Sequence, residues 1–139
     1  MKVAPTSEGR KVQLYGMASP ENWFEDFGSG QFSGGAAQVA GDPAFASTIN
    51  TGATYRVFLT PNGDCKGLYV TSKTAGGFEV RELGGGTSSV SFDYRIVAKR
   101  LGDTTVRLQD VTAQMAQMEQ VKADMAAKNA AQAALKPAH

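Results

Sequence analysis

Apolar and polar positions alternate along residues 55–100 in four short runs, which glycine, proline and asparagine separate from one another. A period of two, with β-branched and aromatic residues between turn-forming residues, is typical of β-strands. Glycine suits the turns because it reaches positive φ without a steric penalty. The pattern therefore predicts an antiparallel meander, with strands at 55–60, 68–71, 78–83 and 90–100.

The same alternation predicts which side chains are buried. In the run 78–83, Phe78, Val80 and Leu83 are set against three charged residues, and these apolar side chains are expected to face inward. We therefore predict a mainly β domain over residues 19–102, built as an antiparallel meander or a sandwich. In its last strand, one buried face is expected to hold Val90, Phe92, Tyr94, Ile96 and Ala98.

Three other segments come before the meander. Residues 1–18 are polar with one short strand-like run, 11–15, and predict an extended N-terminal arm that is loose or adds a strand to a neighbour. Two apolar stretches on either side of a Ser-Gly-Gly sequence predict a hairpin over 31–39. Asp42 followed by Pro43 predicts the start of a short helix.

Aromatic residues gather in the segment 19–30, which contains the only tryptophan. Trp23, Phe24 and Phe27 lie among acidic residues, and aromatic faces of this kind bind pyranose rings. The alternative is that the segment covers an open end of the sheet with its rings turned inward. Both interpretations stay open at this point, and the three rings are the candidate ligand-binding residues.

A different period follows the meander, because the apolar residues of the tail 103–139 recur at about 3.6 positions. They predict an amphipathic C-terminal α-helix from about Asp110, which is placed to cap it, to Leu135. The chain contains no companion helix of this length, so the apolar stripe packs on the β domain or forms a short coiled coil with other copies. Lys122 and Asn129 at coiled-coil positions would weaken the coil but fix its register. The candidate assembly residues of the stripe are Val111, Met115, Met118, Val121 and Met125.

Composition limits the partners and the compartment. The 139 residues carry a net charge of +1, which gives no general attraction to nucleic acid. No apolar run approaches the roughly 20 residues of a membrane span, so we expect no membrane insertion. Residues 1–10 lack the apolar centre of a signal peptide, and we expect synthesis in the cytoplasm without one. A single cysteine, Cys65, excludes an intrachain disulfide.

The residues that catalysis needs are scarce. The only histidine is His139, so no serine or cysteine has a histidine base positioned beside it, and no zinc ligand set exists. Glu21, Glu25 and Asp26 could supply paired carboxylates, but they lie in one local segment without an acidic partner strand. We therefore predict that the protein is not an enzyme and has no catalytic residues, no cofactor and no metal.

Several motifs resemble a β domain found near the C-termini of phage tail-fibre-like and virion-surface proteins, where it often accompanies an endosialidase-type intramolecular chaperone. The similarity covers about residues 20–102. It rests on the order of the motifs WFEDFG at 23–28, DPAFA at 42–46, FLTPNGDC at 58–65, GLYV at 67–70, FEVRE at 78–82, the triple glycine at 84–86 and FDYRIVAKR at 92–100. The resemblance implies trimeric, fibrous or surface-exposed assemblies.

Together these observations predict a non-enzymatic structural protein, a subunit of a phage-like particle or extracellular fibre. Its expected partners are its own copies, as a homo-oligomer and more specifically a trimer, and other particle or fibre subunits. The expected location is a virion or an extracellular assembly. The main alternative is a carbohydrate-binding receptor-recognition module of a fibre tip, with a cell-surface glycan as partner. A third hypothesis is an anchor module that docks by its helix.

Overall fold

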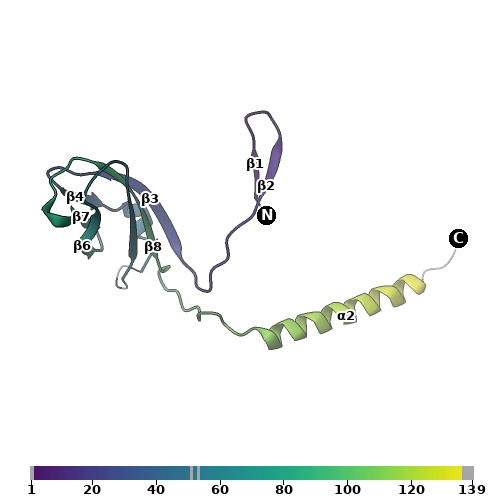
Figure 1. Cartoon of the computed structure of the whole chain (residues 1–139). Helices are drawn as coiled ribbons and strands as arrows, with labels where there is room; N and C mark the ends of the chain where they lie inside the picture. Colours follow the sequence, from purple (N-terminus) through teal and green to yellow (C-terminus); the bar gives the residue numbers. More distant parts are fainter. Residues whose placement is uncertain (1, 51, 53, 136–139) are drawn as a thin grey trace. The chain divides into compact units, whose positions relative to one another are not determined.

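The computed structural model describes residues 2–50, 52 and 54–135 of the chain, which divide into two compact units, 1–105 and 106–139 (Figure 1). The first unit contains eight β-strands, a short α-helix and a 3-10 turn, and the second contains one long α-helix. The predicted mainly β class is confirmed.

The strands form three antiparallel sheets. One is a two-stranded sheet of β1 (Lys2–Pro5) and β2 (Lys11–Leu14). The second has the order β3-β8-β5, with β3 at Phe24–Gln31, β8 at Ser91–Ala98 and β5 at Arg56–Pro61. The third has the order β4-β7-β6, with β4 at Ala36–Ala40, β7 at Gly77–Glu82 and β6 at Leu68–Thr74.

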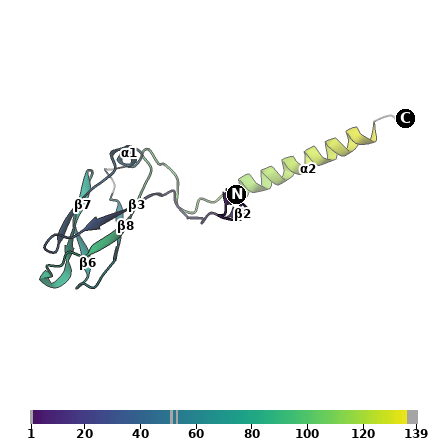
Figure 2. The same cartoon turned by 90° about the horizontal axis from the view of Figure 1, so that it is seen from above.

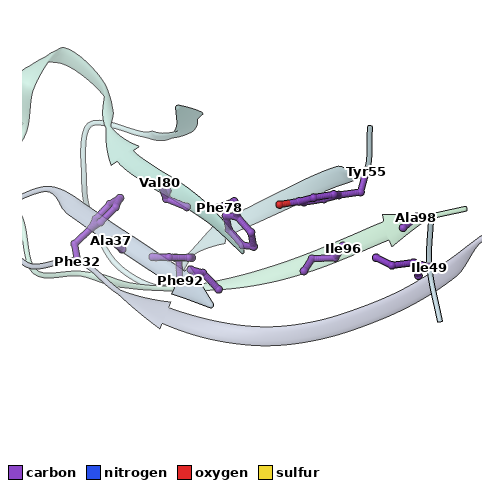
Figure 3. Close-up of a cluster of buried hydrophobic side chains, with 10 residues drawn as sticks. Phe32, Ala37, Ile49, Tyr55, Phe78, Val80, Phe92, Ile96 and Ala98 are labelled. Carbon is purple, nitrogen blue, oxygen red and sulfur yellow. The ribbon is translucent and has the colours of Figure 1, made fainter. Parts of the chain in front are cut away.

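The two three-stranded sheets form a sandwich around one core (Figure 3). Phe92 of β8 lies against Phe32 with ring centroids 5.3 Å apart. Phe78 of β7 meets Tyr94 of β8 edge to face, also at 5.3 Å. Edge-to-face pairs are favourable because the positive ring edge meets the negative ring face. These two ring contacts, together with Val80 and Ile96, hold the sheets together.

The predicted buried face of β8 is confirmed for its central residues. Phe92, Ile96 and Ala98 are buried and Tyr94 is partly buried. Two glycines of β3 lie directly opposite the large rings: Gly28 pairs with Tyr94 and Gly30 with Phe92. A Cβ at either glycine would overlap the opposite ring. The glycines therefore let the rings of β8 cover the backbone of β3.

The predicted meander is wrong in its pairing. The predicted 31–39 hairpin is confirmed only at its turn, where Ser33 and Ala36 form an antiparallel bridge, because the strands on its two sides join different sheets. Among the strands from β3 to β8, only β6 and β7 are consecutive and paired. Every other connection crosses from one sheet to the other, and the tight turn at 33–36 leads from β3 in one sheet to β4 in the other. Turn residues mark where a strand ends but do not determine which sheet the next strand joins.

Glycine-rich loops meet at one end of the sandwich, around the side chain of Glu82. The Glu82 backbone N–H donates to the Gly35 carbonyl at 2.9 Å, and the Ser88 hydroxyl donates to the Glu82 carboxylate. Glu82 is buried and Leu83 is 45% exposed, so the expected inward position of Leu83 is wrong. Strict alternation from Phe78 and Val80 places Glu82 on the inner face, and the Ser88 hydroxyl makes its burial tolerable.

The α-helix α1 (Pro43–Ala46), labelled in Figure 2, confirms the predicted start signal. The Asp42 side chain accepts from the backbone N–H groups of the first turn, which have no partners inside the helix. Just before β5, the buried Tyr55 hydroxyl lies 2.8 Å from the carbonyl oxygens of both Thr74 and Gly77, which flank the β6–β7 turn. Tyr55 thereby connects the two sheets, and burial raises the pKa of its hydroxyl above 10.0.

A two-stranded hairpin precedes the strands of the sandwich in the chain, and one long α-helix follows them. The segment expected as an extended N-terminal arm contains a hairpin, whose paired strands β1 and β2 run from Lys2 to Leu14. The α-helix α2 runs over Thr112–Ala134, and the Asp110 carboxylate accepts from the Thr112 N–H at 2.9 Å at its start. Asp110 was expected to cap the helix, but Val111 occupies the N-cap position and Asp110 precedes it. None of the 23 residues of α2 is buried.

Phe92→Ala is expected to lower the free energy of unfolding by about 3–5 kcal/mol, because it removes a fully buried ring and leaves a cavity between the sheets. The matched control is Phe58→Ala, in the neighbouring strand β5, whose ring is 51% exposed and should cost less than about 1 kcal/mol. Urea unfolding measures both. Equal losses in the two variants would contradict the assignment of faces.

Gly35→Ala is expected to destabilise the protein more than Gly34→Ala. Both glycines have positive φ, 63° at Gly34 and 83° at Gly35. Both alanine variants therefore carry backbone strain of about 1–3 kcal/mol. Only at Gly35 would the added Cβ also overlap a backbone atom, the Gly86 carbonyl oxygen, whereas the space at Gly34 is open. Thermal unfolding of both variants isolates this overlap, and equal melting temperatures would contradict the tight packing of the two loops.

Candidate binding face

The side of the β3-β8-β5 sheet that faces away from the core carries three rows of side chains, which we call the outer face. Register places Phe27, Arg95 and Phe58 in the central row. The row on one side of it is Ser29, Asp93 and Thr60, and the row on the other side is Glu25, Val97 and Arg56. These are the alternate positions of the three strands, so their side chains project opposite to the core.

Two aromatic rings of the central row are open to solvent. Phe27 is 66% exposed and Phe58 is 51% exposed. Between them, the Arg95 guanidinium carbon lies 5.5 Å from the Phe58 ring centroid, which is a cation–π distance. Arg95 Nε also donates to Glu25 Oε1 at 2.7 Å. The central row is therefore a strip of two rings with a fixed, planar hydrogen-bond donor between them.

Asp93 is fixed in the next row by two neighbours. The Ser29 hydroxyl donates to Asp93 Oδ1 at 2.8 Å and the Asn62 amide donates to the same oxygen at 3.2 Å. These hydrogen bonds hold the pKa of the Asp93 carboxyl below its usual value of 3.8, with the Ser29 bond contributing most. Asp93 is therefore an ionised acceptor with a defined orientation on the outer face.

Trp23 lies at one end of the outer face between two cations. The Lys99 ammonium nitrogen is 4.4 Å from the Trp23 ring centroid and the Arg56 guanidinium carbon is 5.5 Å from it. Lys99 also donates to Glu21 Oε2 at 2.7 Å. These contacts fix the segment just before β3 onto the end of β8.

A hollow of about 440 Å³ opens beside Trp23. This volume falls in the range of small-molecule sites. It shares Glu25 and Arg95 with the outer face, so the two are continuous. Its described lining consists of Met17, Ala18, Ser19, Glu21, Asn22, Trp23, Glu25, Arg95 and Val97.

The predicted ring cluster is only partly on this face. Trp23 and Phe27 occupy the outer-face alternation, whereas Phe24 has the inward alternation of β3 and is 38% exposed at the margin of the core. The alternative expectation that all rings turn inward is wrong for Phe27. Phe58 was missed by sequence reasoning. The signal that could have found it is its place among the polar positions of β5, between Arg56 and Thr60.

Three acidic residues precede or begin β3, and each has a defined partner. Glu21 pairs with Lys99, Glu25 pairs with Arg95, and the Asp26 carboxylate accepts from the backbone N–H of the next residue. Glu25 and Glu21 thus connect the segment 21–25 to β8 and to the residue that follows it, whereas Asp26 makes a local contact within β3.

The stripe of α2 is the second predicted site. All five of its residues lie exposed on the helix or at its first turn, with exposures between 41% and 59%. The rest of the described chain therefore leaves each of these five side chains exposed to solvent. The residues are those predicted, Val111, Met115, Met118, Val121 and Met125.

Within the described residues, no three of the histidine, cysteine, aspartate and glutamate side chains gather as a metal site, and Cys65 is a partly buried free thiol. His139 lies outside the described residues. No helix in the described part of the chain combines the length and the apolar character of a membrane span.

Comparison with known proteins identifies no family: no family model matches the chain, and no curated protein matches it. The outer face and the stripe of α2 are therefore the two features from which a function can be inferred.

Ser29→Ala is expected to raise the pKa of the Asp93 carboxyl towards 3.8, because it removes the hydrogen bond that favours the ionised form most. The depressed pKa contributes stability that is present above pH 3.8 and is lost as the pH falls through the folded-state pKa. Carboxyl carbon NMR titration measures the pKa directly. Ser91→Ala, on the same face of β8, is the control, and an unchanged Asp93 pKa in Ser29→Ala would contradict the network.

Proposed function

We propose that the protein is a non-catalytic structural subunit that associates with copies of itself through α2 and presents the β-sandwich. The observation that carries this proposal is the exposed apolar stripe on a helix of 23 residues without a buried residue. Helices in proteins gain most of their stability from packing an apolar face rather than from propensity. The stripe of α2 therefore needs a partner.

Burial of the stripe against a partner would contribute a large favourable free energy. Burying a large apolar side chain gains roughly 1.5–3 kcal/mol, and the stripe has five such side chains. A second copy of α2 is a suitable occupant because it brings an identical stripe of matching length. Met115, Met118 and Met125 are flexible and fill irregular gaps, so the contact would be adaptable rather than a rigid zipper. Lys122 and Asn129, on the same side as the stripe, favour one register.

The N-terminal hairpin supports the same proposal. Its two strands are four residues each, and two-stranded hairpins of this size have little stability alone. Val3, Leu14 and Tyr15 are exposed there. A hairpin with open edges and exposed apolar residues is suited to adding strands from other copies.

The proposed setting, a phage-like particle or an extracellular fibre, and the proposed trimer follow from the resemblance of residues 20–102 to fibre-associated β domains. In such an assembly, oligomerisation through α2 would bring several β-sandwiches together. If each β-sandwich carries one weak binding site, an oligomer binds a surface with a higher total affinity than a single copy does, without any new contact.

Replacing Met115 and Met118 together with glutamate is expected to dissociate the oligomer while the β-sandwich remains folded. Two added charges on the stripe cannot be buried against a second stripe without a large desolvation cost. Sedimentation velocity measures the assembly, and near-ultraviolet circular dichroism of Trp23 and the tyrosines reports the sandwich.

The matched control adds the same two charges on the opposite side of the helix, as Ala116→Glu and Gln120→Glu. This control variant should sediment as the unmodified protein does. If the Met115 and Met118 double variant also keeps the sedimentation coefficient of the unmodified protein, α2 is not the assembly element.

A further inference from the structure

We propose that the outer face of the β3-β8-β5 sheet binds a neutral glycan, with Phe27 and Phe58 as stacking platforms and the hollow beside Trp23 holding one end of the sugar chain. This site differs from the predicted ring cluster, because Phe58 replaces Phe24. The proposal does not depend on self-association by α2, since every residue that it uses lies between residues 17 and 105.

The first argument is the position of the two rings. Phe27 and Phe58 stand on the two edge strands in register with the same residue of β8, Arg95. Strands lie about 4.8 Å apart, so ring positions two strands apart are separated by about 10 Å, which is about the length of a disaccharide. Pyranose C–H groups pack on the negative face of an aromatic ring. Two rings at this spacing suit successive or alternate sugar units.

The second argument is the hydrogen-bonding set between the rings. Sugar hydroxyls are both donors and acceptors, and they are recognised by planar polar side chains in fixed orientations. Arg95 is fixed by Glu25, and Asp93 is fixed by Ser29 and Asn62. Because these groups are already ordered on rigid strands, binding would cost little side-chain entropy.

The third argument is charge, which decides between ligand classes. The outer face and the hollow carry the cations Arg56, Arg95 and Lys99 and the anions Glu21, Glu25 and Asp93. Arg95 and Lys99 are each paired with a glutamate. Nucleic acid needs an excess of unpaired positive charge along its backbone, and this face does not supply one. The balanced charges favour an uncharged ligand.

The fourth argument is the hollow itself. Its lining combines one ring, Trp23, with the Asn22 amide, the Glu25 carboxylate and the Arg95 guanidinium. A cavity of about 440 Å³ with one aromatic wall and a few convergent polar groups suits the terminal unit of a glycan. Since Trp23 is the only tryptophan, its fluorescence reports occupation of the hollow.

The opposite sheet provides a control face. On the side of the β4-β7-β6 sheet that faces away from the core, Gln38 donates a hydrogen bond to the Glu79 carboxylate and Arg81 forms an ion pair with it. Tyr69, of which 43% is exposed, is an aromatic ring on the same side. Tyr69 pairs in register with Arg81, so this face also has an aromatic ring beside an arginine. It lacks a second ring in the same row.

The test is titration of the full-length protein with a panel of neutral hexasaccharides: the cello-, xylo-, manno-, malto- and chito-oligomers. Binding is followed by Trp23 fluorescence and by backbone amide NMR. At least one hexasaccharide should shift amides of β3, β5 and β8 and change the Trp23 emission. Phe27→Ala and Phe58→Ala should each weaken that binding at least about tenfold, through loss of a stacking surface. Tyr69→Ala should leave it within about twofold.

Three results would overturn the proposal: no hexasaccharide binding at millimolar concentration, equal weakening by Tyr69→Ala, or binding of oligothymidylate on this face in place of every sugar. Amide spectra of the free variants show that each is folded. The titration repeated with the Met115 and Met118 glutamate variant separates the two proposals, because the affinity per site should be unchanged when the oligomer is lost.

Discussion

The packing of aromatic rings between the two sheets is the interaction on which the rest of the first unit depends. Phe92 against Phe32 and Phe78 against Tyr94 fill the middle of the sandwich. Gly28 and Gly30 leave the backbone of β3 open to the rings of Tyr94 and Phe92 on the neighbouring strand β8. The aliphatic residues Val39, Val80 and Ile96 pack around these rings, and close packing of this kind makes the spacing of the sheets sensitive to the size of each ring.

The same packing determines the outer face. β8 is the central strand of its sheet, and its residues alternate between the core and the outer face. Phe92 and Tyr94 enter the core, so Asp93 and Arg95 must point outward. Because the inner rings fix the position of β8, the outward side chains are held in place by the core. A rigid outer face and a well-packed core are consequences of one alternating pattern.

Much of this fold could be predicted from the sequence, and the errors have physical causes. The strands from β5 to β8, the buried face of β8 and the start of α1 were predicted because alternation and capping are local properties. The strands β1 and β3 were missed, and in β3 the inward positions opposite Tyr94 and Phe92 are glycines, so the strand shows no apolar alternation there. Strand pairing was missed because a glycine-rich turn fits both a hairpin and a crossing between sheets. The burial of Glu82 was missed because its partner, Ser88, is contributed by a later loop. On the outer face, Phe27 was expected as a candidate ligand-binding residue, whereas Phe58 required knowledge of which strand lies beside β8.

The central claim is that the chain is a self-associating subunit, and the mass of the native particle tests it most directly. Sedimentation equilibrium of the full-length protein at micromolar concentration gives that mass without a label or a variant. We expect a species of three times the chain mass of 14.6 kDa. A single species of 14.6 kDa over the whole concentration range would contradict the claim.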